Sequence, residues 1–156
     1  MTAATRRAPS PNDALSCNEA GYQIIREFEG LKLKAYVCPA GKQTIGYGHT
    51  ATARAGAEIT KEQAEKLLRE DVARCEAAIK RHVKVPLSAN QFSALCSWVF
   101  NLGEGNLASS TLLARLNEGA YARIPEELMR WVFVKRERFA GLVRRREAEV
   151  KLWGKA

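Results

Sequence analysis

The chain has 156 residues, of which 46% are hydrophobic and 27% are charged. This length suits one ordinary domain, whose folding buries roughly 70% of the unfolded surface, and the composition excludes intrinsic disorder. Lysine and arginine number 25 against 17 acidic residues, which gives a formal net charge of +8. Such a charge attracts nucleic acid, anionic lipid and cell wall alike, so it does not by itself select a partner.

No apolar run reaches the roughly 18 to 20 residues needed to span a bilayer, and none near the start resembles a signal peptide. We therefore expect a soluble chain that another factor, or a targeting segment absent from this sequence, delivers if it acts outside the cytoplasm. The four cysteines lack the close pairs of a zinc site, so no metal or other cofactor is expected. Disulfides remain possible, and all three complete pairings stay open for Cys17, Cys38, Cys75 and Cys96.

The N-terminal third predicts an arm, a helix and a hairpin. Residues 1–15 have no periodic apolar pattern, which indicates a flexible arm. A capping box that begins at Ser16 and apolar residues at every fourth position predict a helix ending near Glu29, with Gly30 as its C-cap. Alternating apolar and polar residues then predict a hairpin, with strands at 33–37 and 44–48 around a turn at 39–41 and a short third strand at 57–59.

The sequence predicts that the remainder of the chain, from residue 61 onward, is helical. Capping boxes at Thr60 and Ser88 begin two helices, the first being the longest, and further helices are expected at 110–117, 124–134 and 139–152. We therefore predict one mainly α, α+β domain over residues 16–156. Its parts are a small N-terminal lobe with a β-hairpin (16–60), a connecting helix (61–81) and a larger helical lobe (82–156).

Glu29 has the properties of a general acid. Glycoside cleavage needs a carboxylic acid that stays protonated and a second group on the other face of the sugar. The carboxyl end of a helix disfavours negative charge, and the neighbouring Phe28 and Leu31 are apolar, so both features favour the protonated form. A glutamate at a helix end is usually only a solvated charge, so this position needs further support.

That support comes from the spacing of the residues that follow. Residues 29–36, then Cys38, Gly41 and 44–49, closely resemble the signature of phage lysozymes of glycoside hydrolase family 24. The family pattern is Glu, eight residues, Asp or Cys, five residues and Thr, which Glu29, Cys38 and Thr44 match. Later segments are similar to the family's helical-lobe motifs and to its basic C-terminal motif (100–105, 110–113 and 141–147). The resemblance covers residues 20–153 and implies a lysozyme-like fold.

The resemblance also implies catalytic roles. Glu29 would protonate the glycosidic oxygen, Thr44 would orient the attacking water, and Cys38 would be the catalytic partner where many members have Asp. A thiol needs a polar pocket or a cation, such as Lys34 or Lys42, to ionise at neutral pH. The alternative is that Cys38 is passive or disulfide-bonded and that Glu29 works alone.

A cysteine in the site brings the possibility of redox control, because a disulfide would remove its thiolate. We hypothesise that Cys17 is the masking partner of Cys38, because it lies near the start of the helix that carries Glu29. Cys75 and Cys96 fall on predicted helices and are expected in the core or as a structural pair.

Substrate contacts are also implied by the resemblance. Asn101, Ser110 and Thr111 would bond saccharide hydroxyl or acetamido groups, although helix capping is an equal alternative for Ser110. Within the arginine cluster at 144–146, one residue would pair with Glu29 or with muropeptide carboxylates, and the other two would be solvated. Arg145 is our candidate for that contact.

These features predict an endolysin, a muramidase that cuts the β-1,4 bond between N-acetylmuramic acid and N-acetylglucosamine for host lysis and phage release. The expected partner is the peptidoglycan glycan strand, without nucleic acid or stable membrane insertion, and the chain is expected to be a monomer. It would be made in the host cytoplasm and act in the periplasm or cell wall after holin release or export.

Three alternatives stay open. A lytic transglycosylase would need the glutamate but no directed water, and the presence of Cys38 and Thr44 argues against it. A wall-binding or inactive homologue is kept open by the cysteine at position 38. A nucleic-acid-binding domain would fit the charge and the arginines at 144–146, but no nucleic-acid motif accompanies them.

Overall fold

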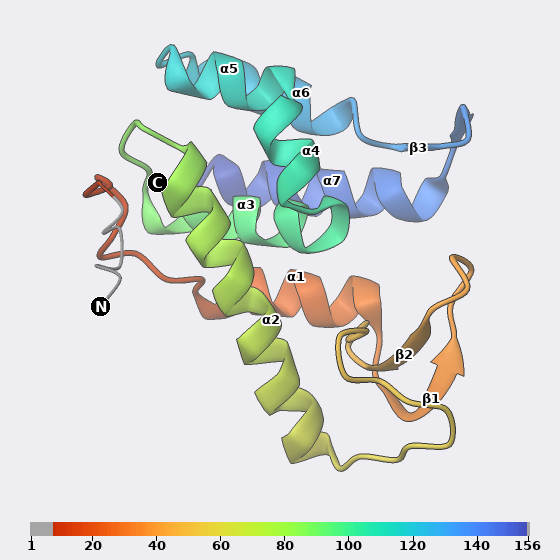
Figure 1. The fold of residues 1–156 in the computed structure, drawn as a ribbon. Helices are drawn as coiled ribbons and strands as arrows, with labels where there is room; N and C mark the ends of the chain where they lie inside the picture. Colours follow the sequence, from red (N-terminus) through yellow and green to blue (C-terminus); the bar gives the residue numbers. More distant parts are fainter. Residues whose placement is uncertain (1–7, 156) are drawn as a thin grey trace.

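The computed structural model describes residues 8–155 (Figure 1). Within this range the chain forms seven α-helices, one 3-10 turn (Tyr121–Arg123) and four short strands. The helices are α1 (Glu19–Glu29), α2 (Lys61–His82), α3 (Ala89–Leu102), α4 (Glu104–Ser109), α5 (Thr111–Asn117), α6 (Ile124–Met129) and α7 (Ala140–Trp153). The strands are β1 (Lys32–Val37), β2 (Gln43–Gly46), β3 (Phe133–Val134) and β4 (Glu137–Arg138). No helix among these residues is long and apolar enough to cross a membrane.

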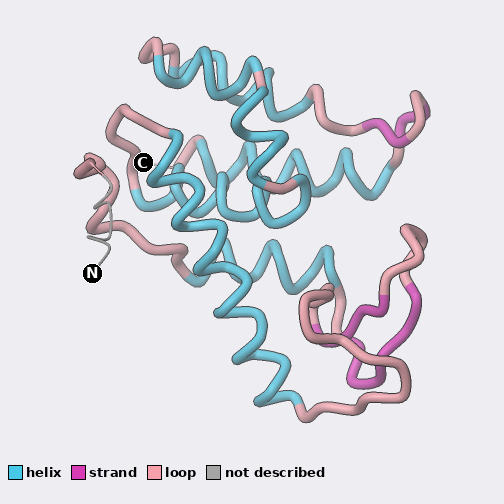
Figure 2. Tube along the Cα trace, viewed as in Figure 1, coloured by secondary structure: helices cyan, strands magenta, loops and turns pink. Residues whose placement is uncertain are grey.

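The predicted architecture, mainly helical with a small hairpin lobe, is confirmed. Strands β1 and β2 pair antiparallel, with Lys32 opposite Gly46 and Tyr36 opposite Thr44. Helix α2 has 22 residues, about 33 Å of helix, and it packs on β2 near one end and on α3 and α4 near the other. Helices α1, α4 and α7 pack on α3, and α5 and α6 pack on α4 and α7 respectively, while both two-stranded hairpins lie on one side of the molecule (Figures 1 and 2).

Two helices begin where their capping boxes predict. Thr60 Oγ1 accepts from the Gln63 backbone N–H at 3.1 Å, and the Gln63 side chain accepts from the Thr60 N–H at 2.8 Å. Ser88 and Gln91 make the same reciprocal pair at 3.1 and 2.9 Å. Each box satisfies backbone donors that would otherwise lack partners in the first turn.

The first helix begins later than predicted. Its N-cap is Asn18, whose side chain accepts from the Gly21 N–H at 3.1 Å, so the expected capping box at Ser16 is wrong. The residues before the helix are held by tertiary contacts instead. The Cys17 N–H donates to Glu76 at 2.7 Å, and the Asn18 N–H donates to Ser93 at 2.9 Å.

The expected helix over 124–134 is also wrong beyond Met129, because a β3–β4 hairpin follows it. The hairpin turns through Lys135 and Arg136, which both have positive φ, and the Phe139 N–H donates to the Val132 carbonyl at 2.9 Å. This turn geometry favours asparagine and glycine, so a lysine–arginine pair gave no turn signal.

One expectation for the first hairpin also needs correction. The segment at 57–59 makes only an isolated bridge, between Lys34 and Glu58, rather than a third strand. Alternation did not bury one face of β1, because Leu33 and Val37 are 42% and 59% exposed. A two-stranded sheet has no further layer to cover its outer surface, so its apolar residues stay in solvent.

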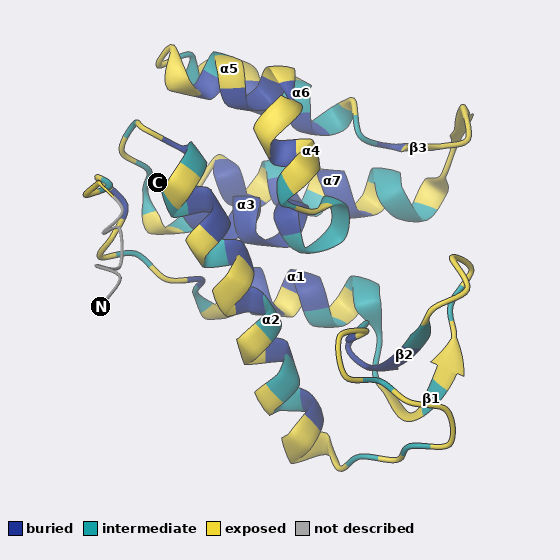
Figure 3. Ribbon diagram, in the orientation of Figure 1, coloured by how far each residue is buried: buried dark blue, intermediate teal, exposed yellow. Residues whose placement is uncertain are grey.

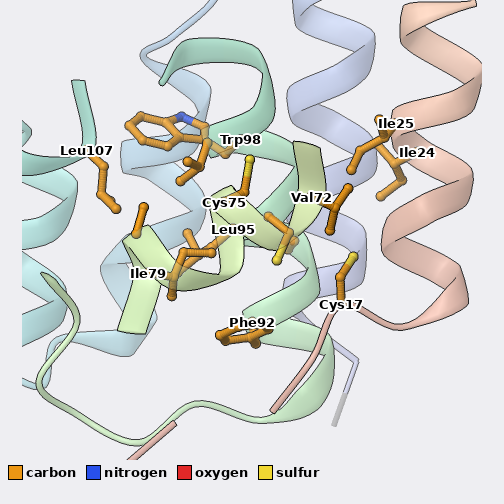
Figure 4. Packing of buried hydrophobic residues seen from close by; sticks show 14 of the residues in the cluster. Cys17, Ile24, Ile25, Val72, Cys75, Ile79, Phe92, Leu95, Trp98 and Leu107 are labelled. Atoms are coloured by element: carbon orange, nitrogen blue, oxygen red, sulfur yellow. The ribbon is translucent and has the colours of Figure 1, made fainter. Parts of the chain in front are cut away.

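The hydrophobic core fills the helical lobe between α1, α2, α3 and the later helices (Figures 3 and 4). Trp98 is fully buried and meets Trp131 edge to face, with ring centroids 5.3 Å apart. The expected flexible arm over residues 1–15 is wrong for residues 10–13, which hydrogen bonds hold in place. Asn12 is fully buried, donates to the Val85 carbonyl at 2.9 Å and accepts from the Leu87 N–H at 2.8 Å. The part of the arm at 1–7 lies outside the described residues.

Candidate active site

Glu29 is the last residue of α1 and is held from two sides. Gly30 ends the helix with positive φ, and its N–H donates to the Arg26 carbonyl. Glu29 Oε2 accepts from Arg145 Nη1 at 2.7 Å, with side chains 21% and 4% exposed. On the other side lies Gly48, where an added Cβ would come within 2.8 Å of Glu29 Oε1. The carboxylate is therefore fixed between α7 and the segment that follows the β1–β2 hairpin.

The partner of Glu29 is itself buried in a network. Arg145 donates from Nε to the Ser97 hydroxyl at 3.3 Å and from Nη2 to the Ser97 carbonyl at 3.2 Å. The Ser97 hydroxyl donates to Glu149 Oε2 at 2.6 Å, which lies 3.7 Å from Arg145 Nε. These bonds leave Nη1 of Arg145 directed at Glu29. The wholly apolar surroundings expected for Glu29 are therefore wrong, because one of its oxygens bonds to the buried guanidinium of Arg145.

A second buried pair continues the network inward. Arg146 Nε lies 2.7 Å from Glu149 Oε1, although the angle does not make a hydrogen bond, and Arg146 Nη2 donates to Glu149 Oε2 at 3.1 Å. Burial raises the pKa of Glu149 and lowers the pKa of Arg146, while their mutual attraction opposes both shifts. The expectation that the arginines beside Arg145 are solvated is therefore wrong for Arg146 and right for the exposed Arg144.

Glu29 opens into a cavity of about 500 Å³ between α1, the end of α3 and the start of α7. Its walls also include Asn101, Phe139, Gly141, Leu142 and Arg144. A second cavity, of about 480 Å³, lies between α2 and α3 and is lined by Gly48. Because Gly48 touches Glu29 and also borders this second cavity, the carboxylate stands between the two hollows. That arrangement suits a long ligand that passes the carboxylate.

The other two catalytic candidates lie on the β1–β2 hairpin. Cys38 follows β1, and its N–H donates to the Lys42 carbonyl at 2.8 Å, while Thr44 is buried in β2 and donates to the same carbonyl at 3.0 Å. Hydrogen bonding from the Lys42 backbone, and then from the Thr44 hydroxyl, lowers the pKa of the Cys38 thiol. The Thr44 hydroxyl has one proton, so it serves either the carbonyl or the thiolate at a given moment.

The cationic help expected for Cys38 is not what the structure shows. Lys42 acts through its backbone, and the Lys34 ammonium pairs with Glu58 at 3.3 Å. Among residues 8–155, no hydrogen bond joins Glu29 to Cys38 or to Thr44. The structure therefore places the three candidates around one hairpin without linking them directly.

The hypothesis that Cys17 masks Cys38 does not fit this conformation. The four cysteines are free, and Cys17 is buried in the core with Cys75 and Cys96 (Figure 4). It precedes α1, whereas Cys38 follows it, and the 11 residues of α1 span about 16 Å. A disulfide needs Cα atoms within about 7 Å, so the two thiols cannot meet here.

The expected substrate-binding residues fall in different places. Asn101 lines the Glu29 cavity, where its Oδ1 accepts from Arg146 Nη2 at 2.9 Å. Ser110 is the N-cap of α5, accepting from the Leu113 N–H at 3.0 Å and donating to the Leu107 carbonyl at 2.8 Å, so the capping alternative describes it. Thr111 lines a separate cavity of about 280 Å³.

Sequence reasoning missed two residues that shape the site, Ser97 and Glu149, whereas the motif 44–49 already included His49. Both residues fix Arg145 in place. Ser97 lies in the apolar sequence of α3 and Glu149 in the charged sequence of α7, and neither belongs to a recognisable motif. His49, directly after Gly48, is buried and lies 2.7 Å from Asp71 through Nδ1 and 2.7 Å from Thr52 through Nε2. This pair anchors the segment facing Glu29 to α2. Within the described part of the chain, no cluster of acidic, histidine or cysteine side chains could hold a metal ion.

Comparison with known proteins gives a consistent result. A family model described as phage lysozyme matches residues 26–149. An endolysin of Acyrthosiphon pisum secondary endosymbiont phage 1 is 47% identical over 89% of this chain and 98% of its own length. An endolysin of Bacillus phage B103 is 40% identical over 89% of this chain, which spans only 54% of that longer relative. Among solved structures, the muramidase domain of SpmX from Asticaccaulis excentricus superposes with a TM-score of 0.85, at 37% identity over 90% of this chain and 99% of that domain.

Proposed function

The chain belongs to the phage lysozyme family, and from that membership we propose that it hydrolyses the β-1,4 bond between N-acetylmuramic acid and N-acetylglucosamine with Glu29 as proton donor. It is an endolysin, a muramidase among the glycoside hydrolases, and endolysins degrade peptidoglycan to lyse the host cell. One observation carries the assignment of the acid. Glu29 is the carboxylate that buried Arg145 holds in the wall of the cavity between α1, α3 and α7.

The two oxygens of Glu29 have different surroundings, which suggests where the proton resides. Oε2 accepts a charge-assisted bond from Arg145, whereas Oε1 faces Gly48 and the cavity. A proton on Oε1 would not disturb the bond to Arg145. From Oε1 the proton can pass to the leaving oxygen of a glycan strand that lies in the cavity.

We assign the second catalytic role to Cys38, with Thr44 as its partner. A thiolate at Cys38 is supported by its lowered pKa and by the hydroxyl of Thr44 beside it. It would direct water, or attack directly, at the anomeric carbon, while Thr44 orients the water. Asn101 is our candidate for a saccharide contact, because it lines the same cavity as Glu29. We further propose that the protein acts as a monomer on the host cell wall after holin release or export.

Product analysis tests this function. Purified peptidoglycan is digested with the protein, and the soluble products are examined by mass spectrometry beside a Glu29→Gln digest. We expect products that end in reducing N-acetylmuramic acid with the native chain and none with the variant. Products carrying a 1,6-anhydro end would instead assign a lytic transglycosylase, and no products from the native chain would contradict the proposal.

A further inference from the structure

Two hairpins carry the exposed hydrophobic surface of this protein. Within residues 8–155, the large hydrophobic side chains that are at least 38% exposed are Leu33, Tyr36, Val37, Phe133, Val134 and Phe139. The first three belong to β1, and the last three belong to β3 and the residue that follows β4. Scattered apolar residues on a surface are ordinary, but their confinement to two elements marks an interaction surface.

Basic residues alternate with these apolar side chains. The first hairpin carries Lys32, Lys34 and Lys42, and the second carries Lys135, Arg136 and Arg138, all exposed. Lys34 pairs with Glu58, but in the described chain no ion pair involves the other five. Each hairpin thus presents a mixed surface of apolar groups and cations, and among the described residues every one of these cations except Lys34 has no ion-pair partner.

Both hairpins are attached to the walls of the Glu29 cavity. Strand β1 begins three residues after Glu29, and β4 ends one residue before Phe139, which lines that cavity. The two hairpins lie on the same side of the molecule, and the turn of the first points toward the second (Figure 1); β1, β3 and β4 are largely exposed, whereas β2 is buried (Figure 3). A ligand that leaves the cavity on this side therefore passes between them.

The two charged residues at the tip of the second hairpin have a disfavoured backbone conformation. Lys135 and Arg136 have φ of 48° and 70°. Two consecutive residues with positive φ suit the twist of a two-residue hairpin, but asparagine and glycine adopt that conformation at a lower cost than lysine and arginine. Disfavoured backbone conformations cluster at functional sites, so this turn supports a role for the Lys135 and Arg136 side chains.

We propose that the two hairpins form a clamp on the peptidoglycan strand, on either side of the bond that is cleaved. The apolar side chains pack on the C–H faces of the sugar rings, and the cations pair with the free carboxylates of the stem peptides. This inference rests on the proposed function and adds contacts beyond the cavity itself. A linear polymer fits the geometry, because it can lie between the hairpins and reach Glu29.

The clamp should act on binding rather than on chemistry. Its side chains lie outside the cavity of Glu29, except Phe139, so they hold the strand equally in the ground state and the transition state. Uniform binding of this kind changes KM and leaves kcat nearly constant. The cations should matter only where the strand carries stem peptides, whereas the apolar groups should matter for any glycan.

Two variants and two substrates separate these contributions. Phe133→Ser/Val134→Ser removes apolar surface, and Lys135→Asn/Arg136→Gly removes the charges while giving the turn its preferred residues. Initial rates are measured on intact sacculi and on glycan strands from which an amidase has removed the stem peptides. Lys61→Gln/Lys66→Gln, on the exposed side of α2, is the control for lost charge.

We expect the serine variant to raise KM about fivefold or more on both substrates, with kcat within twofold of the native value. The asparagine–glycine variant should raise KM several-fold on intact sacculi only, although its melting temperature should equal or exceed that of the native chain. If the turn had only a structural role, this variant would be more stable and its KM would not rise. The control pair should match the native KM on both substrates.

An unchanged KM for both hairpin variants, with the native enzyme active, would overturn the clamp and leave the muramidase assignment standing. Sedimentation with vesicles of phosphatidylglycerol and phosphatidylethanolamine tests whether the hairpins bind a membrane instead. Vesicle binding that the hairpin variants lose, together with an unchanged KM, would assign this surface to a membrane and overturn the clamp. A native chain that fails to turn over sacculi would refute the proposed function itself.

Discussion

Replacement of Glu149 by glutamine is the most informative change to the buried network. Glu149 is fully buried and lies between Arg145 and Arg146, so with Glu29 the four side chains form a cluster of two anions and two cations. Glutamine has nearly the same shape and can still accept from Ser97. It removes one negative charge, however, and leaves the cluster with a surplus positive charge.

The expected cost follows from the burial of the surviving cation. Removal of one partner from a buried ion pair typically destabilises a protein by about 3–5 kcal/mol, because the other charge stays desolvated and unpaired. Arg146 is fully buried, so its guanidinium cannot recover hydration without opening the lobe. In a chain of this size 1 kcal/mol lowers the melting temperature by about 2–4 °C, so Glu149→Gln should lower it by about 6–20 °C.

Thermal unfolding followed by circular dichroism measures this effect, with Glu147→Gln as the matched control. Glu147 is exposed on the same helix, so its replacement should stay within about 0.5 kcal/mol of the native chain. A double variant, Glu149→Leu/Arg146→Met, removes both charges and should recover part of the loss. A Glu149→Gln protein as stable as the control would refute the view that this network is held together by charge.

Three further outcomes test other parts of the site. Gly48→Ala places a Cβ 2.8 Å from Glu29 Oε1, so its kcat should fall. Gly56→Ala is the control, because it has a similar backbone cost of about 1–2 kcal/mol but open space around it, and it should keep full activity. Equal kcat values for the two variants would contradict the close approach of Gly48 to Glu29. Cys38→Asp should extend activity to lower pH. The Cys38 thiolate, even with its lowered pKa, is protonated as the pH falls, whereas an aspartate stays ionised down to a pH of about 3.9. If kcat/KM of both proteins fell at the same acidic pH, a catalytic thiolate would be excluded. Ser110→Ala should cost about 1 kcal/mol of stability, as for a lost N-cap, with turnover of sacculi unchanged; a large loss of turnover would restore its expected role in binding.

Local signals in the sequence predicted the parts of the fold that depend on near neighbours. The capping boxes at Thr60 and Ser88 involve residues three positions apart, and the structure forms both. The first hairpin and the glycine that ends α1 are equally local, and so is the spacing that singled out Glu29. A motif of this kind can be read because its members are held together by a few adjacent residues.

The contacts that position the catalytic candidate are long-range, and no short pattern encodes them. Glu29 and Arg145 are 116 residues apart, and Ser97 and Glu149 are 52 residues apart. The rotation of α7 against α3 decides which of the three successive arginines faces Glu29. The hypothesis that Cys17 masks Cys38 has the same limit, because order along the chain does not give separation in space.

The second hairpin shows a different limit. Its turn uses lysine and arginine in a conformation that other residues adopt more easily, so propensity alone favoured a continued helix. Such a conflict between local preference and structure is expected where residues are retained for function.

The central claim is that Glu29 supplies the proton for glycan cleavage, and the initial rate of reducing-end release from purified sacculi tests it most directly. Glu29→Gln should be measured beside Glu27→Gln, because both carboxylates border the same cavity and only Glu29 is held by Arg145. We expect Glu29→Gln to lose about 10²- to 10⁴-fold in rate, as for the loss of a general acid, and Glu27→Gln to stay within a few-fold of the native chain. A Glu29→Gln enzyme that retains the native rate would contradict the account.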